Sequence, residues 1–186
     1  MICKYLSDPN WLLTIFTLLG VIVAFLTLWA QTKSFKLTIG ADLGMKLDDR
    51  FNSCQFAVER LAAATALKNK ASLENAEDVF DFFDTVGLFV RLKALKAEIA
   101  HSLFFHWVNL YWYSGERYIR DRQKESNLTW ADFEQLYKIT HAIERRRDPG
   151  SRDLRLTPDD IERYLDAEIE STSPSVRRSF GGRSSF

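Results

Sequence analysis

The apolar and polar positions divide the chain into one continuous apolar run near the N-terminus and several amphipathic stretches after it. Residues Trp11 to Ala30 carry no charged side chain, and twelve of these twenty positions are Leu, Ile, Phe or Val. A helix of this length spans about 30 Å, the thickness of the hydrocarbon core of a bilayer. Trp11 and Trp29 lie at its ends, where aromatic rings are typical of membrane interfaces. The run therefore predicts one transmembrane helix over residues 11–30.

Two other interpretations of this apolar run are less favoured. A cleaved signal peptide has an apolar region of about 7–15 residues that ends in small residues. This run is longer and ends in the sequence Leu28-Trp29-Ala30. A helix that is apolar on all faces can also be buried, but a domain of this size offers little room for one.

The basic residues around the run predict its orientation. Lys4 precedes it, and four basic residues follow it, namely Lys33, Lys36, Lys46 and Arg50. Because the side richer in Lys and Arg usually faces the cytoplasm, residues 1–10 are expected to form a short extracytoplasmic N-terminus. The predicted localisation is the cell inner membrane, single-pass, with the lipid bilayer as a partner and the C-terminal domain in the cytoplasm.

After the run, apolar positions recur at spacings of three and four residues, which indicates amphipathic helices. The fold class expected is all-α, a single N-terminal transmembrane helix followed by a small bundle of about four to five helices. The helices are expected over residues 42–69, 79–90, 97–122, 129–147 and 157–170. The helix over residues 79–90 is apolar on most faces, so it should be the central buried one.

The boundaries of the domain follow from turn and cap residues. The helical cytoplasmic domain should cover residues 31–147, and Asp148-Pro149-Gly150-Ser151 predicts a break. Thr157 followed by Pro158 and two acids predicts the start of a C-terminal helix within residues 148–170. Residues 171–186 are Ser-rich, which is typical of a disordered tail. The helix that begins near residue 42 either continues the first helix or follows a break near Gly40.

The charge and the cysteines of the chain argue against two features, nucleic acid binding and a disulfide bond. Lys and Arg together number 25, as do Asp and Glu, so the formal net charge is zero and nucleic acid is not an expected partner. The two cysteines, Cys3 and Cys54, would lie on opposite sides of the predicted membrane, which argues against a disulfide between them.

A few polar residues are candidates for catalysis or for metal binding. Asp81 and Asp84 are three residues apart on one helix, a spacing that suits acid–base work, but an ion pair of Asp84 with Arg91, Arg117 or Arg120 is favoured. Glu98 and His101 have the Glu-x-x-His spacing of di-iron bundles, which require two such motifs. No phosphate loop, nucleophile elbow or zinc spacing is present in the sequence, so no catalytic residue, cofactor or metal is predicted.

A basic run follows the helix that ends near residue 147. It comprises Arg145, Arg146, Arg147, Arg152 and Arg155. Cations are favourable at the C-terminus of a helix, so solvated capping is the favoured interpretation. Binding of phosphate or of anionic lipid is the alternative.

Three stretches together resemble a known family. They are Asp78–Gly87, Trp107–Arg120 and Trp130–Leu136. They resemble a bacterial family that is catalogued as a domain of unknown function. The resemblance covers residues from about Leu43 to Arg147, and it implies a short N-terminal anchor followed by a helical cytosolic region. It implies no catalytic residues.

The function expected is that of a membrane-anchored helical interaction or regulatory module. Phe104, Tyr111 and Trp112 widen the apolar arc of the helix over residues 97–122, so this helix either packs on two sides or meets a partner. The three residues form the candidate interaction face for a homo-oligomer or a membrane-protein partner. One alternative is a membrane-acting effector of a toxin or defence system. The other is an enzyme that uses Asp81, Asp84 or His101.

Overall fold

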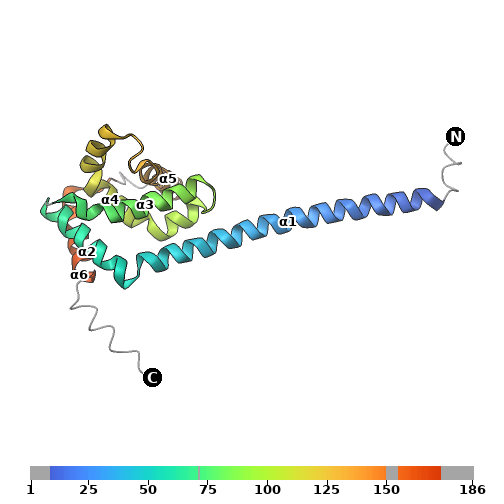
Figure 1. Ribbon diagram of the computed structural model, residues 1–186, viewed down its shortest axis with the longest axis horizontal. Helices are drawn as coiled ribbons and strands as arrows, with labels where there is room; N and C mark the ends of the chain where they lie inside the picture. The colour runs from blue at the N-terminus through green and yellow to red at the C-terminus, as the bar shows by residue number, and fades with distance from the viewer. Residues whose placement is uncertain (1–8, 71, 150–154, 173–186) are drawn as a thin grey trace, which may run out of the picture. The chain divides into compact units, whose positions relative to one another are not determined.

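The computed structural model describes residues 9–70, 72–149 and 155–172. All regular structure in these ranges is helical, which confirms the all-α class (Figure 1). The elements are α1 (Pro9–Phe51), α2 (Cys54–Asn69), the short 3₁₀ helix η2 (Leu73–Ala76), α3 (Glu77–Arg91), α4 (Ala97–Glu125), α5 (Ala131–Arg147) and α6 (Pro158–Thr172). Most of the predicted N-terminal segment 1–10 and of the predicted tail 171–186 lies outside the described residues.

The apolar run forms part of α1, and the prediction made from it needs correction. Within the described residues, no helix is long and apolar enough to cross a membrane. The predictions of a transmembrane helix over residues 11–30 and of a single-pass inner-membrane protein are therefore wrong. The apolar run does not form a helix of its own, because α1 is a helix of 43 residues that continues through charged sequence to Phe51.

The chain divides into two compact units, residues 1–40 and residues 41–186. Helix α1 passes Gly40 without a break. Of the two alternatives, a continuous helix rather than a break near Gly40 is therefore correct. The helix predicted over residues 42–69 is instead interrupted between α1 and α2. Ser53 explains the interruption, because its hydroxyl accepts a hydrogen bond from the Phe56 N–H at 3.2 Å and so caps the start of α2.

The interruption also changes which side of α2 faces the core. Val58 and Thr65, which an unbroken helix would turn inward, are exposed. The inner side of α2 is formed instead by its buried residues, which are Phe56, Ala57, Arg60, Ala63, Ala64, Ala66 and Leu67. A charged residue, Arg60, therefore lies among apolar ones.

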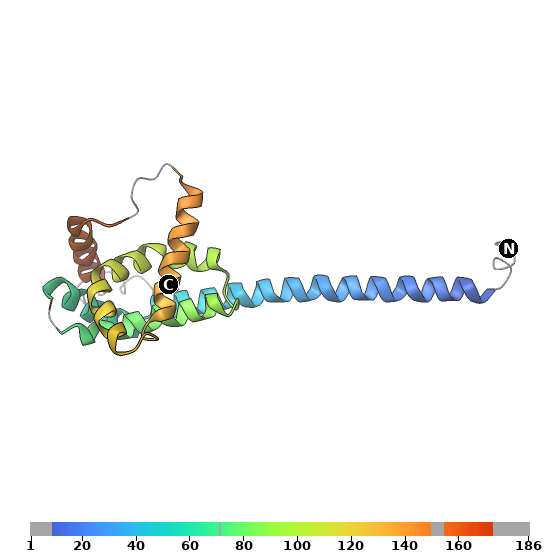
Figure 2. The same ribbon diagram turned by 90° about the horizontal axis from the view of Figure 1, so that it is seen from above.

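Helix α3 lies at the centre of the second unit, as its apolar sequence predicts. It packs against α4 and α5, and α6 packs against α2 and α4 (Figure 2). The core is rich in aromatic rings, and the ring of Phe83 stacks on that of Phe133 at 5.3 Å between centroids. The largest fully buried aromatic side chains are Phe51, Phe80, Phe82, Phe83, Phe104, Tyr111, Trp112 and Phe133. Offset and edge-on ring pairs add stabilisation beyond the area that they bury.

Helix α6 begins as its sequence predicts. The Thr157 hydroxyl accepts a hydrogen bond from the Asp160 N–H at 3.2 Å, and the Asp160 carboxylate accepts one from the Thr157 N–H at 3.3 Å. This reciprocal capping satisfies two backbone donors at the start of the helix.

Candidate functional site

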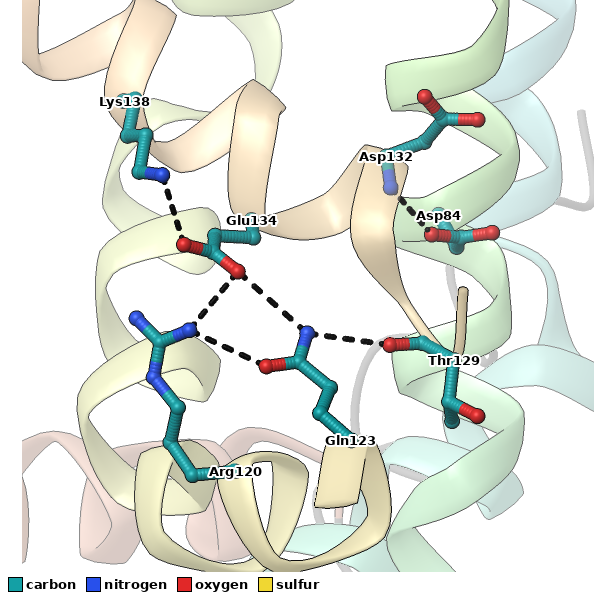
Figure 3. A network of polar contacts seen from close by, with 7 residues as sticks. All are labelled: Asp84, Arg120, Gln123, Thr129, Asp132, Glu134 and Lys138. Atoms are coloured by element: carbon teal, nitrogen blue, oxygen red, sulfur yellow. Dashed lines mark hydrogen bonds and ion pairs between the residues drawn. The ribbon is translucent and has the colours of Figure 1, made fainter. Parts of the chain in front are cut away.

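The start of α5 is held by residues of α3. Trp130 precedes α5 in the left-handed region, with φ of 50°, and its side chain caps no backbone group. The carboxylate of Asp84 supplies the missing cap, because its Oδ1 accepts hydrogen bonds from the N–H groups of Asp132 at 2.9 Å and Phe133 at 3.0 Å. Figure 3 shows Asp84 on α3 facing the first turn of α5. Asp84 is thus a helix cap supplied from a neighbouring helix.

Two more side chains of α3 reach the same turn. The indole N–H of Trp130 donates to Asp81 Oδ1 at 2.7 Å. Arg91 donates to both carboxylate oxygens of Asp132, at 2.7 and 3.0 Å. Such bidentate pairs fix orientation as well as adding energy. The predicted ion pair of Asp84 with an arginine is replaced by one between Arg91 and Asp132.

Gly87 lies between these contacts and allows the two helices to approach each other. A Cβ atom at this position would lie 2.1 Å from the carbonyl oxygen of Asp132. The spacing of Asp81, Asp84, Gly87 and Arg91 places all four on one side of α3. We call these four residues, with Trp130 and Asp132, the α3–α5 clasp.

Burial raises the pKa of Asp84 above its usual value, while the N–H of Phe133 opposes the shift. We expect Asp84→Ala to lower the free energy of unfolding by about 1–2 kcal/mol, because two N–H groups of α5 lose their acceptor. Asp84→Asn keeps an acceptor oxygen and should lose less. Urea denaturation followed by far-ultraviolet circular dichroism measures both variants. Equal stability of Asp84→Ala and the wild type would contradict the capping role.

A second polar network joins α4 to α5 beside the clasp (Figure 3). Glu134 is paired with Arg120 at 2.8 Å and with Lys138 at 2.7 Å. Gln123 donates to the carbonyl oxygen of Thr129 at 3.1 Å. Burial alone would raise the pKa of Glu134, but hydrogen bonds from Lys138 and Arg120 lower it overall. These contacts fix the connection that leads into α5.

His101 takes part in a different contact from the predicted Glu-x-x-His motif. Its Nε2 lies 2.8 Å from Glu144 Oε2, and Arg147 donates to its Nδ1 at 3.2 Å. Burial lowers the pKa of His101, and Glu144 opposes the shift. A neutral ring with its proton on Nε2 satisfies both partners. Glu98 is exposed, and no metal-binding group of three or more His, Cys, Asp or Glu residues forms within the described ranges.

The candidate interaction face lies inside the domain. Phe104 and Tyr111 are 0% exposed and Trp112 is 1% exposed. Tyr111 contacts Phe83 of α3, and Trp112 contacts Phe133 of α5, with ring centroids 5.8 and 5.4 Å apart. These rings pack the core and offer no exposed surface to a partner.

The residues assigned to the membrane boundary and to topology all lie on α1. Trp29 is 63% exposed, and Lys46 and Arg50 are also exposed. Lys46 forms an ion pair with Asp42 at 2.8 Å, one turn away on the same helix. The side chains of Trp11, Lys33 and Lys36 are outside the described part of the structure.

A buried ion pair that was not predicted from the sequence joins α2 and α6. Arg60 Nε lies 3.1 Å from Glu168 Oε1, and the Glu168 side chain is fully inaccessible. The guanidinium also lies over the ring of Phe51, at 4.3 Å from its centroid. Burial raises the pKa of Glu168 above its usual value, and Arg60 opposes the shift. Glu168 shares the apolar side of α6 with Ile161 and Leu165, which was a signal for a buried charge, whereas Arg60 lies off the side that the sequence of residues 42–69 turns inward.

Comparison with known proteins places the chain in a family. Residues 14–140, more than half of the 186 residues, match the model of a family described as a domain of unknown function, DUF4760. The chain belongs to the DUF4760 family. The resemblance to a family of unknown function is thereby confirmed, although the DUF4760 match gives no support to a membrane anchor. No curated protein and no solved structure matches the chain.

The residues matched by the DUF4760 model include some of the contacts described above and exclude others. It begins within the apolar run of α1 and ends at Thr140 in α5, so it contains every residue of the α3–α5 clasp. Arg145, Arg155 and Glu168 lie beyond it.

Proposed function

We propose that this member of DUF4760 is a non-enzymatic interaction module that self-associates through the apolar part of α1. The observation that carries the proposal is the exposure of large apolar side chains along this helix. Eleven of them are exposed in the stretch from Ile15 to Trp29, with Phe16 at 68% and Phe25 at 69%. Contiguous apolar surface of this kind is typical of sites that other molecules cover.

The spacing of these residues supports association between helices. Ile15, Leu18, Ile22, Phe25 and Trp29 are separated by three, four, three and four residues, the pattern of a coiled-coil seam. The opposite side of the helix carries smaller or polar residues at Gly20, Ala24 and Thr27, with the large Phe16 beside them. We call the five large residues the α1 seam.

A second copy of the chain is the partner that fits this seam. No charged residue lies between Trp11 and Ala30, and the formal net charge of the chain is zero, so two copies meet without electrostatic repulsion. An apolar strip is complementary to itself, which is what a symmetric dimer requires.

The polar residues of the second unit support a non-enzymatic role. Asp81 and Asp84, the pair considered for acid–base chemistry, are hydrogen-bonded to the start of α5. His101 lies between Glu144 and Arg147. Each group that suggested catalysis thus contributes to contacts between helices.

Disulfide crosslinking tests the α1 seam. In a full-length background with Cys3→Ser and Cys54→Ser, we expect Ile22→Cys to form a covalent dimer as its main product under mild oxidation. Ile22 is the middle residue of the seam, so two copies bring it together whether the helices pair in parallel or antiparallel. Non-reducing electrophoresis and light scattering measure the dimer fraction.

Ala24→Cys is the matched control, because residues two apart on a helix point about 200° apart. It should crosslink several-fold less than Ile22→Cys. The double substitution Ile22→Glu and Phe25→Glu should give a monomer by light scattering while the second unit stays folded. Equal crosslinking at positions 22 and 24, or a wild-type monomer at high concentration, would reject the proposal.

A further inference from the structure

A cavity of about 290 Å³ opens at the surface of α4 and α5, on the side where the basic run follows α5. Its walls come from two helices and from the segment that precedes α6. The lining residues are Trp112, Tyr113, Glu116, Arg120, Tyr137, His141, Arg145 and Arg155. The fold therefore brings two members of the basic run, Arg145 and Arg155, to one concave site.

The aromatic wall of the cavity is fixed by contacts within the domain. The rings of Trp112 and Tyr137 stack, with centroids 5.0 Å apart and planes inclined by 15°. The hydroxyls of Tyr113 and Tyr137 lie 2.6 Å apart. His141 Nε2 lies 2.6 Å from the buried Oδ1 of Asn109. Such a wall keeps its shape without a ligand, which lowers the ordering cost of binding.

The charged groups that line the cavity are mainly positive. Three arginines line it together with one carboxylate, that of Glu116. Arg120 is paired with Glu134 and lies over the ring of Trp112, 5.2 Å from its centroid. Arg145 is exposed, and among the described residues no carboxylate forms an ion pair with it. The lining thus contains three guanidinium groups and one carboxylate.

We propose that this cavity binds a small molecule that carries a phosphate group. The guanidinium groups of Arg145 and Arg155 would bind the phosphate oxygens, since the planar donors of arginine match that geometry. The rings of Tyr137 and His141 would contact the organic part of the ligand. A volume of about 290 Å³ suits a small phosphate monoester. This binding role is additional to self-association through α1 and does not depend on it.

The two arginines that follow Arg145 allow binding in the cavity to be distinguished from attraction by general surface charge. Arg145, Arg146 and Arg147 are consecutive at the end of α5, and all three are exposed. Only Arg145 of the three lines the cavity, and Arg147 instead donates to His101. Arg146 therefore offers the same charge at nearly the same place without access to the site.

Titration of the full-length chain with phenyl phosphate at constant ionic strength, followed by isothermal calorimetry, tests the proposal. We expect saturable binding of phenyl phosphate, weaker binding of inorganic phosphate and no binding of phenol. Arg145→Gln should weaken phenyl phosphate binding about tenfold or more, and Arg155→Gln should have a similar effect. Arg146→Gln should leave the affinity unchanged.

Thermal unfolding without ligand shows whether each variant is folded, and substitution of these exposed arginines should not lower the Tm. Equal weakening by Arg145→Gln and Arg146→Gln would mean that only general surface charge attracts the anion, and it would overturn the proposal. The absence of saturable binding to the folded wild type at millimolar phenyl phosphate would overturn it as well.

Discussion

Gly87→Ala is expected to destabilise the second unit by about 3 kcal/mol or more, at the upper end of the range for overpacking. In an exposed helix the same substitution would add about 1 kcal/mol of stability. The sign reverses here because the new Cβ would lie 2.1 Å from the carbonyl oxygen and 2.5 Å from the carbonyl carbon of Asp132. Those atoms belong to the backbone, so no side chain can rotate away to relieve the clash.

The result is measurable by urea denaturation, with circular dichroism and tryptophan fluorescence as two probes. Trp130 is part of the α3–α5 clasp, so one of the five tryptophans that contribute to the fluorescence lies at the start of α5. Gly20→Ala is the matched control, since nothing lies within 4 Å of a Cβ at that position. It should leave the stability of the second unit unchanged. A Gly87→Ala variant as stable as the wild type would contradict the close approach of α3 and α5.

Arg60→Met is expected to cost about 3–5 kcal/mol, because it removes the guanidinium that offsets the buried charge of the Glu168 carboxylate. The Arg60 side chain is 9% exposed and the Glu168 side chain 0%, so water replaces little of the lost interaction. Met keeps most of the apolar volume, which limits the effect to the charge. Equilibrium denaturation at pH 7 provides the measurement.

The loss should depend on pH in a defined direction. Burial raises the pKa of Glu168 above 4.5, and Arg60 acts against this shift. A carboxyl group whose folded-state pKa is raised destabilises the fold as pH rises from its unfolded pKa through its folded pKa. Arg60→Met removes the opposing charge and raises that pKa further. The stability difference from the wild type should therefore be small below pH 4.5 and grow towards neutral pH.

The double variant Arg60→Met with Glu168→Leu provides the control. Replacing both partners of a buried ion pair with apolar residues is often neutral or stabilising. The double variant should therefore recover most of the stability that Arg60→Met loses, and its pH dependence should lack the contribution of Glu168. A double variant as unstable as the single one would mean that Arg60 acts through its packing on Phe51 rather than through Glu168.

The sequence predicted the start or the position of a helix correctly where the residues that determine it lie within that helix. Thr157, Pro158 and Asp160 identify the start of α6, since the capping contacts lie within three residues of each other. The apolar residues of α3 mark it as the central helix, because no face of it could be left in water. These inferences needed no knowledge of the neighbouring helices.

The contacts that the sequence did not predict join residues that lie far apart along the chain. Asp84 looked like an ion-pair partner or an acid–base group, yet its hydrogen bonds go to N–H groups 48 and 49 residues away. The helix expected from residue 129 begins at Ala131, and Asp84 caps its first turn. Nothing in the sequence near Trp130 indicates that α3 would supply the cap.

The aromatic residues of α4 show a different difficulty. Phe104, Tyr111 and Trp112 cover a wide arc of the helix, and a wide apolar arc suits either a partner protein or two neighbouring helices. The structure covers them with α3 and α5. Ser53 shows the opposite difficulty. The spacing of apolar residues predicted one helix over residues 42–69, but the Ser53 hydroxyl caps the start of α2 and so separates two helices.

The α3–α5 clasp has a consequence for how the second unit folds. A helix that carries its own cap can begin to form before it meets its neighbours. Helix α5 receives its cap from Asp84, so its first turn is completed only after a chain loop of nearly fifty residues has closed. Formation of α5 is thereby tied to a long-range contact, which slows the search but joins the two helices into one cooperative folding step.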